Sequence, residues 1–168
     1  MSSFRLRHAC NIYARDIQYL CSNSDIKTIS EFRRKILDIS IPKNEYLIDM
    51  SFYTNTFKSS IVHIPLEVNP YEVSVSKYIQ TKMLIWETNA LIDRHNHPGV
   101  HCIFVPIGGE LFQGIYSSHE SCSRIDLINK NSYSYIHDSM GEHTLANHLK
   151  HMNVSLHTYI DERFFTER

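Results

Sequence analysis

Short runs of β-branched and aromatic residues alternate with turns over most of this 168-residue chain beyond residue 60, and this pattern constrains the fold most strongly. Such runs, bounded by turn residues, predict strands. The Gly108-Gly109 pair predicts a hairpin, and Asn129-Lys130-Asn131 predicts another turn. The expected strands are Ile61–Leu66, Val73–Ser76, Lys82–Glu87, Gly99–Pro106, Glu110–Ser117, Ser123–Leu127, Ser132–His137 and Asn153–Ile160. Many short strands of this kind are typical of a mainly β barrel of the jelly-roll type.

The N-terminal part of the chain has helical rather than strand periodicity. Its apolar residues recur at helical spacing, as in Ile12, Ile17 and Leu20, and then Ile29, Phe32, Ile36 and Leu37. A second helix is expected to begin near Ser24-Asp25, and Pro42 is expected to stop it. We therefore predict one domain over residues 1–168, with a helical segment over 1–41 packed on a barrel over about 61–160.

The overall composition argues against several function classes. The formal net charge of −1 gives no electrostatic support for binding nucleic acid or an anionic membrane surface. The sequence contains no run of about 18 apolar residues, so no membrane span is predicted, and the first residues lack the apolar core of a signal peptide. The four cysteines show no C-x-x-C spacing. We expect a cytoplasmic protein with free thiols, whose oligomeric state the sequence does not specify.

Three histidines suggest a metal site. His95 and His97 form an H-x-H pair, and residues two apart in an extended strand point to the same face. His143, from a later strand, offers a third nitrogen. Such a site leaves room for substrate, although a chain with eleven histidines also allows a chance pair on an exposed strand. Imidazole ligands suit zinc, copper, iron and nickel, so the ligand type alone does not choose the metal.

The spacing around these histidines matches a known pair of motifs. The H-x-H pair is followed by four residues and Cys102, and after six more by Gly109; His143 is followed by three residues and Asn147. This pattern resembles the two metal-binding motifs of the cupin barrels. Cys102 stands at the usual glutamate position, and that replacement marks the thiol dioxygenase branch of the cupins.

Further blocks resemble cysteine dioxygenase of the animal type. They are Trp86 nine residues before His95, the step His101-Cys102, the block from Tyr135 to His143 (Y-I-H-D-S-M-G-E-H), and the block from Val154 to Tyr159 (V-S-L-H-T-Y). The four blocks occur in the family's order over roughly residues 83 to 160, about half of the chain. Chance agreement across all four is improbable.

The resemblance implies an activity and a metal. It implies Fe(II) bound by His95, His97 and His143, and addition of both oxygens of O₂ to the sulfur of cysteine or a related small thiol, which gives a sulfinic acid. A third histidine in place of the carboxylate of other non-haem iron sites removes a negative charge, which a thiolate substrate restores. Tyr71 and Trp86 are the expected substrate contacts.

The resemblance also assigns roles next to the metal. Cys102 and Tyr159 stand where the family has a thioether crosslink between cysteine and tyrosine, so a Cys102–Tyr159 bond is expected. Ser155, His157 and Tyr159 alternate and therefore share one face of the last strand. In the family the corresponding residues form a hydrogen-bonded relay, which orients the tyrosine hydroxyl near substrate and oxygen. No G-x-S-x-G elbow surrounds Ser155, so a serine hydrolase triad is excluded.

One expected residue is missing. Family members that act on cysteine carry an arginine in a Y-x-R segment that binds the substrate carboxylate, but the corresponding stretch here is Tyr71-Glu72-Val73. Lys77, Lys82 or Arg94 could supply the positive charge instead, though none stands at the matching position. Three functions therefore compete: an Fe(II) thiol dioxygenase, a cupin with a different oxygenation or hydrolysis, and a non-catalytic cupin that senses or binds a small molecule. The Cys102/Tyr159 pair and the alternating Ser155, His157 and Tyr159 favour the first, which we predict.

Overall fold

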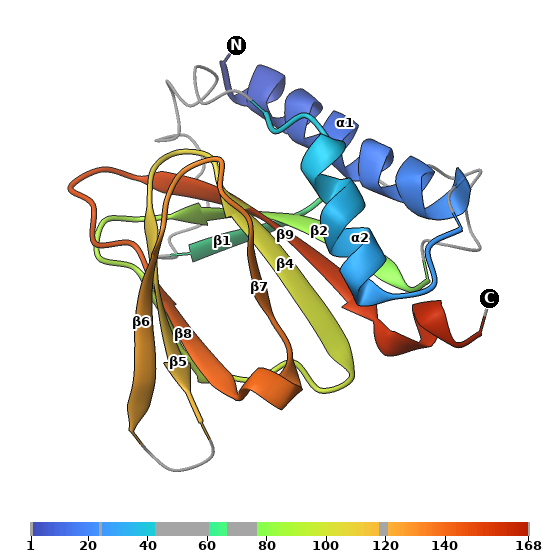
Figure 1. The fold of residues 1–168 in the computed structure, drawn as a ribbon. Coiled ribbons are helices and arrows are strands. Elements are labelled where there is room, and N and C mark those ends of the chain that lie inside the picture. The colour runs from blue at the N-terminus through green and yellow to red at the C-terminus, as the bar shows by residue number, and fades with distance from the viewer. Residues whose placement is uncertain (1, 24, 43–60, 67–76, 118–120, 168) are drawn as a thin grey trace.

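Two antiparallel sheets form the body of the protein. The computed structural model describes residues 2–23, 25–42, 61–66, 77–117 and 121–167. Over these residues one sheet has five strands in the order β1-β2-β9-β4-β7, and the other has four in the order β3-β8-β5-β6 (Figure 1). The strands are β1 Ile61–Pro65, β2 Ile79–Trp86, β3 Leu91–His95, β4 Val100–Pro106, β5 Leu111–Tyr116, β6 Cys122–Ile128, β7 Ser134–Ile136, β8 Glu142–Ala146 and β9 Asn153–Asp161. The predicted mainly β jelly-roll fold is thus confirmed.

Two helices cover the outer face of the five-stranded sheet (Figure 1). They are α1 (Ser2–Asn23) and α2 (Ile29–Lys35), and a short 3-10 turn, η1 (Ile36–Asp38), follows α2. Apolar side chains of both helices share one buried cluster with the outward-facing residues of the sheet, such as Met83 and Leu156. None of the described helices is long and apolar enough to cross a membrane.

The second helix begins later than the sequence pattern predicted. Its cap is Thr28 rather than Ser24-Asp25, because Thr28 and Glu31 form a capping box in which each side chain binds the other's backbone N–H. The α-helix ends at Lys35 and η1 ends at Asp38, so Pro42 is not what stops it.

Most of the predicted strands are present within a few residues of the expected ends. The structure also contains β3 and β8, whose ranges were not predicted as strands. Both carry many polar residues, and all five residues of β3 are exposed or half-buried, so neither has the apolar alternation that marks a strand. They pair with each other, and His95 lies opposite His143. The predicted strand Val73–Ser76 lies outside the described residues.

The inner face of the five-stranded sheet is fixed by its register. Tyr159 of β9 lies opposite Cys102 of β4, and His157 lies between Phe104 of β4 and Lys82 of β2. Residues directly opposite one another in neighbouring strands point to the same side. This side meets the four-stranded sheet in a second apolar cluster, which includes Trp86, Cys102, Phe104 and Leu145.

Candidate metal centre

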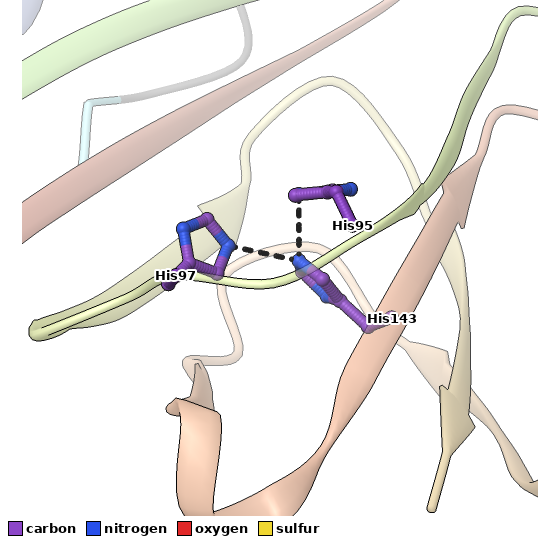
Figure 2. Close-up of side chains that lie close together, drawn as sticks. All are labelled: His95, His97 and His143. Atoms are coloured by element: carbon purple, nitrogen blue, oxygen red, sulfur yellow. Dashed lines mark hydrogen bonds between the residues drawn. The ribbon is translucent and has the colours of Figure 1, made fainter. Parts of the chain in front are cut away.

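Three histidines converge between the two sheets (Figure 2). His95 is the last residue of β3, His97 follows two residues later, and His143 lies in β8. The Nε2 atom of His143 lies 3.0 Å from Nε2 of His97 and 3.0 Å from Nε2 of His95. The three side chains therefore point the same type of nitrogen at one place.

The backbone around the triad sets its position. The amide N–H of His97 donates to Asp138 Oδ1 at 2.9 Å, which ties the segment after β3 to the 3-10 turn η3 (Asp138–Met140). Gly141 then leads into β8 with a φ of 100°. A Cβ at this residue would clash with the carbonyl oxygen of Tyr116, so only glycine allows this entry into β8.

Hydrogen bonds fix the tautomer of His95. Its Nδ1 lies 2.8 Å from the carbonyl oxygen of Asp93, which can only accept, so Nδ1 carries the proton. The Nε2 atom of His95 is then a bare acceptor that faces another imidazole nitrogen. A bound metal ion satisfies such converging lone pairs, and a backbone carbonyl on the other ring nitrogen is the usual arrangement around a metal-binding histidine.

Gln113 of β5 supports His143, and sequence reasoning missed it. Its Nε2 atom lies 3.0 Å from Nδ1 of His143, and its Oε1 atom accepts a hydrogen bond from Ser134 Oγ at 2.9 Å. Exchanging the amide O and N keeps both contacts, since a serine hydroxyl also accepts, and lets Gln113 accept the Nδ1 proton. In that orientation Nε2 of His143 is free for a metal ion. The signal in the sequence was a polar residue between Leu111 and Ile115, at an inward position of a strand.

Burial keeps His97 and His143 uncharged. Burial, together with the neighbouring His95, lowers the pKa of His143 to about 3 and that of His97 to about 4. Both imidazoles are therefore neutral at pH 7, which is the form that binds metal.

The geometry fits a metal ion. Two nitrogens about 2.1 Å from one ion and at right angles to each other are about 3.0 Å apart, which is the spacing between these Nε2 atoms. Among the described residues no carboxylate joins the triad, so the site offers three neutral ligands. The triad could hold a metal ion and leave further coordination positions open.

Cys102 and Tyr159 border the triad. They lie opposite each other on β4 and β9, and the Tyr159 ring centroid is 5.8 Å from that of His97. Burial raises the pKa of both the Cys102 thiol and the Tyr159 hydroxyl, so both groups are protonated at pH 7. All four cysteines are free thiols, and Cys102 is fully buried.

A chain of hydrogen bonds extends from Trp86 toward Cys102. Trp86 Nε1 donates to Ser155 Oγ at 2.8 Å, and Ser155 Oγ lies 2.8 Å from His157 Nε2. The other nitrogen of His157 lies 4.0 Å from Cys102 Sγ, and the His157 ring stacks on Phe104. Burial holds the pKa of His157 well below its usual value. Ser155 and His157 are thus joined by a hydrogen bond, and the rings of His157 and Tyr159 are stacked with their centroids 6.2 Å apart.

The remaining expected substrate contacts differ in position. Trp86 is fully buried, with its indole directed at Ser155. Tyr71 and Val73 lie outside the described residues. Arg94 forms an ion pair with Glu142 and lies over the Tyr116 ring, 4.8 Å from its centroid. Its charge is therefore already compensated.

A second group of titratable side chains lies on the helix-covered side of the sheet. His101, His137 and Glu162 bring their potential ligand atoms within 4.8 Å of one another. Nδ1 of His137 accepts from the Ser139 N–H, so the proton is on Nε2 and is donated to Glu162 Oε1 at 2.6 Å. A metal ion on Nε2 would move the proton to Nδ1, where the Ser139 N–H already points. In this group, which we call the outer cluster, His137 is thus hydrogen-bonded through both nitrogens, to Ser139 and to Glu162.

Comparisons with known proteins support the fold. No protein-family model matches the chain, and no curated protein matches it. The Schizosaccharomyces pombe Cnp3 cupin domain is similar at 8% identity and a TM-score of 0.51, over 66% of this chain and 71% of that one. A Bacillus halodurans protein reaches 0.52 at 10% identity, over 68% and 80%. An oxalate oxidase in complex with the substrate analogue glycolate reaches 0.50 at 13% identity, over 74% and 66%. These similarities show that the chain has the cupin fold.

Proposed function

We propose that this protein is an Fe(II)-dependent dioxygenase of a small thiol. The observation that carries the proposal is the position of the Cys102–Tyr159 pair, whose tyrosine ring lies 5.8 Å from that of His97. A cysteine and a tyrosine in register at this distance from a histidine triad match the residues that the sequence resemblance assigns to thiol dioxygenases. Neither a hydrolytic site nor a binding site requires them.

The protein's residues would divide the work as follows. His95, His97 and His143 would hold the iron, which when bound supplies a site for the thiol sulfur and for the reduction of O₂. Since the three imidazoles are neutral, they leave the full charge of the ion available to draw a thiolate from solution. Gln113 would keep His143 in the metal-binding tautomer.

Tyr159 would orient the reacting groups. Its hydroxyl remains protonated at pH 7 because burial raises its pKa, so it can donate a hydrogen bond to substrate or oxygen beside the triad. The chain from Trp86 through Ser155 holds His157 in place. His157 fills the space between Phe104 and Cys102 and thereby fixes the side of the pocket against which Tyr159 lies.

A thioether between Cys102 and Tyr159 would lock the tyrosine ring. Forming it joins Sγ to a ring carbon and removes the thiol hydrogen and one ring hydrogen, so two electrons pass to an oxidant, which here is O₂. In iron-loaded protein kept in air, the peptides that carry Cys102 and Tyr159 are expected to be joined, with a mass about 2 Da below the sum of the two separate peptides. Cys102→Ser protein treated in the same way should keep its full mass.

Three neutral histidines also suit zinc and a hydrolytic or hydration reaction, which is the main alternative. The two differ in the metal that they need. Oxygen uptake is measured with anaerobically loaded Fe(II) protein and, in parallel, with Zn(II) protein. Cysteine, cysteamine and 3-mercaptopropionate are offered in turn. We expect about one O₂ consumed per thiol with Fe(II), sulfinate as the product, and none with Zn(II).

Absence of uptake with every thiol, from protein with one iron bound per chain, would disprove the proposal. Tyr159→Phe is the matched variant, because it removes only the hydroxyl and keeps the ring next to His97. It is expected to lower kcat about 10- to 100-fold while iron binding is unchanged. Equal kcat in both proteins would remove Tyr159 from the mechanism.

A further inference from the structure

Lys82 places a positive charge on the inner face of the five-stranded sheet. It lies opposite His157, in the same row of side chains as Phe104. This row belongs to the side of the sheet that carries Trp86, Cys102 and Tyr159. Lys82 is half-buried, and its Nζ lies 5.2 Å from the centroid of the Tyr159 ring.

The two other candidate cations are placed differently. Arg94 is paired with Glu142. Lys77 is exposed, and its Nζ lies over the ring of Tyr78, whose side chain belongs to the cluster on the helix-covered side. Among the residues that the structure describes, none forms an ion pair or a hydrogen bond with the Lys82 side chain. Lys82 is thus the candidate whose charge faces the site without a described counter-ion.

The neighbouring His63 adds no second charge. It lies on β1 opposite Leu84, so it is a diagonal neighbour of Lys82 on the same face. Burial and the nearby Lys82 ammonium lower the pKa of His63, and its imidazole is neutral at pH 7. A neutral imidazole can donate a hydrogen bond at this edge, while the attraction for an anion comes from Lys82.

The distances suit a small substrate. The Tyr159 ring centroid lies 5.2 Å from Lys82 Nζ and 5.8 Å from the centroid of the His97 ring, so the ammonium is at most about 11 Å from the His97 ring. A short mercapto acid with its sulfur on the metal and its carboxylate on Lys82 spans about 10 Å, including both contacts. An open hollow of about 320 Å³ reaches Tyr159 from the side of Gln80 and Val100, and Lys77 also lines it.

We propose that Lys82 binds the anionic group of the substrate, and that the substrate is therefore a thiol carrying a carboxylate or a similar anion. The proposal rests on the proposed thiol dioxygenase function. A single ammonium is a point charge, so it attracts a carboxylate without the two-point geometry that arginine imposes. We expect the site to accept anions on spacers of different length and to reject a cationic thiol.

The test uses binding rather than turnover. Protein loaded with Co(II) is titrated without oxygen with 3-mercaptopropionate and with cysteamine, and the thiolate-to-cobalt absorption band gives each Kd. Lys82→Met keeps the side-chain length and removes the charge. It is expected to weaken 3-mercaptopropionate about 10- to 100-fold and to leave cysteamine within about twofold. Lys82→Arg should restore most of the affinity, and Lys77→Met, which removes the other lysine charge near Tyr159, should weaken 3-mercaptopropionate far less than Lys82→Met does.

A second probe separates this proposal from the proposed function. Propionate has the carboxylate and no sulfur, and Co(II) broadens its proton NMR signals when it binds nearby. Broadening in the wild type that Lys82→Met abolishes would support Lys82 as the anchor even if no thiol gave the absorption band. A band in both proteins with equal Kd values would overturn the Lys82 proposal while the thiol site stood. Melting curves of the variants show that each is folded.

Discussion

The protein has two groups of histidines on opposite sides of the five-stranded sheet, and they differ in how their protons are used. In the triad, the described hydrogen bonds engage the outer nitrogens of His95 and His143, and the Nε2 atoms meet one another at 3.0 Å. In the outer cluster, both nitrogens of His137 are already engaged, one by Ser139 and the other by Glu162. Proximity is similar in the two groups, whereas free lone pairs are found in the triad.

The difference shows that a histidine cluster is identified by its hydrogen bonds rather than by its distances. The rings of His101 and His137 are stacked at 4.4 Å with an angle of 27° between them. The rings of His95 and His97 are 5.0 Å apart and nearly perpendicular, at 77°. Stacked rings direct their nitrogens alongside each other, while steeply inclined rings can direct them at a common point. The triad is thus arranged for a ligand and the outer cluster for packing.

Removing one histidine from each group tests this comparison most directly. His97→Ala is expected to abolish stable iron binding, because two neutral imidazoles without a carboxylate hold Fe(II) far more weakly than three. His137→Ala, the matched control, is expected to keep one iron per chain. Metal content is measured by mass spectrometry after loading and desalting, and circular dichroism reports the fold. Full iron occupancy in His97→Ala would refute the ligand assignment.

Gln113 sharpens the same comparison, because its amide, with O and N exchanged, accepts the Nδ1 proton of His143 and leaves Nε2 free. Gln113→Leu removes the amide and keeps most of the volume, and is expected to weaken metal affinity about 10- to 100-fold. Ser134→Ala, which removes only the group behind Gln113, should have a smaller effect in the same direction. Competition with a chelator gives both affinities. An unchanged affinity in Gln113→Leu would show that another group sets the His143 tautomer.

The fold and the triad could be predicted from the sequence because they depend on local patterns. Strand patterns and turn residues indicate a jelly roll, and the H-x-H spacing indicates a shared face. The edge strand β3 and its neighbour β8 were missed because they bury few apolar side chains. His95 and His143 lie on these two strands. The histidine motif thus predicted the site, although the apolar periodicity did not predict the two strands that carry it.

Long-range register could not be predicted from the sequence. Gln113 contacts a histidine 30 residues away, and Lys82 meets His157 across a strand pair that joins distant segments. Nothing in the sequence distinguishes Lys82 from Lys77 or Arg94 as the cation that faces the site. These pairings depend on which strands become neighbours, and only the assembled sheet determines that.

Acid is expected to affect the triad more than the outer cluster in metal-free protein. The pKa values of His97 and His143, about 4 and about 3, lie below that of an unfolded histidine, so the unfolded chain takes up protons first as the pH falls. These two histidines therefore contribute no penalty above about pH 6.5, and they destabilise the folded protein increasingly as the pH falls toward 4. A His97→Gln/His143→Gln variant should lose about 5 °C less in melting temperature between pH 7 and pH 4.5 than the wild type. In His101→Gln the melting temperature should fall by nearly as much as in the wild type. An equal fall in melting temperature in all three proteins would contradict burial of neutral His97 and His143.

The smallest expected effect comes from the link in the outer cluster. Glu162→Gln removes a charge that is half exposed, so it should lower the free energy of unfolding by only about 0.5 kcal/mol, measured by urea denaturation at pH 7. His137→Gln and the double variant complete a cycle that isolates the pairwise contribution. Metal content should be unchanged in all three variants, because both nitrogens of His137 are engaged by protein groups in the wild type. A loss of bound metal in Glu162→Gln would mean that this carboxylate binds an ion, and the distinction between the two groups of histidines would fail.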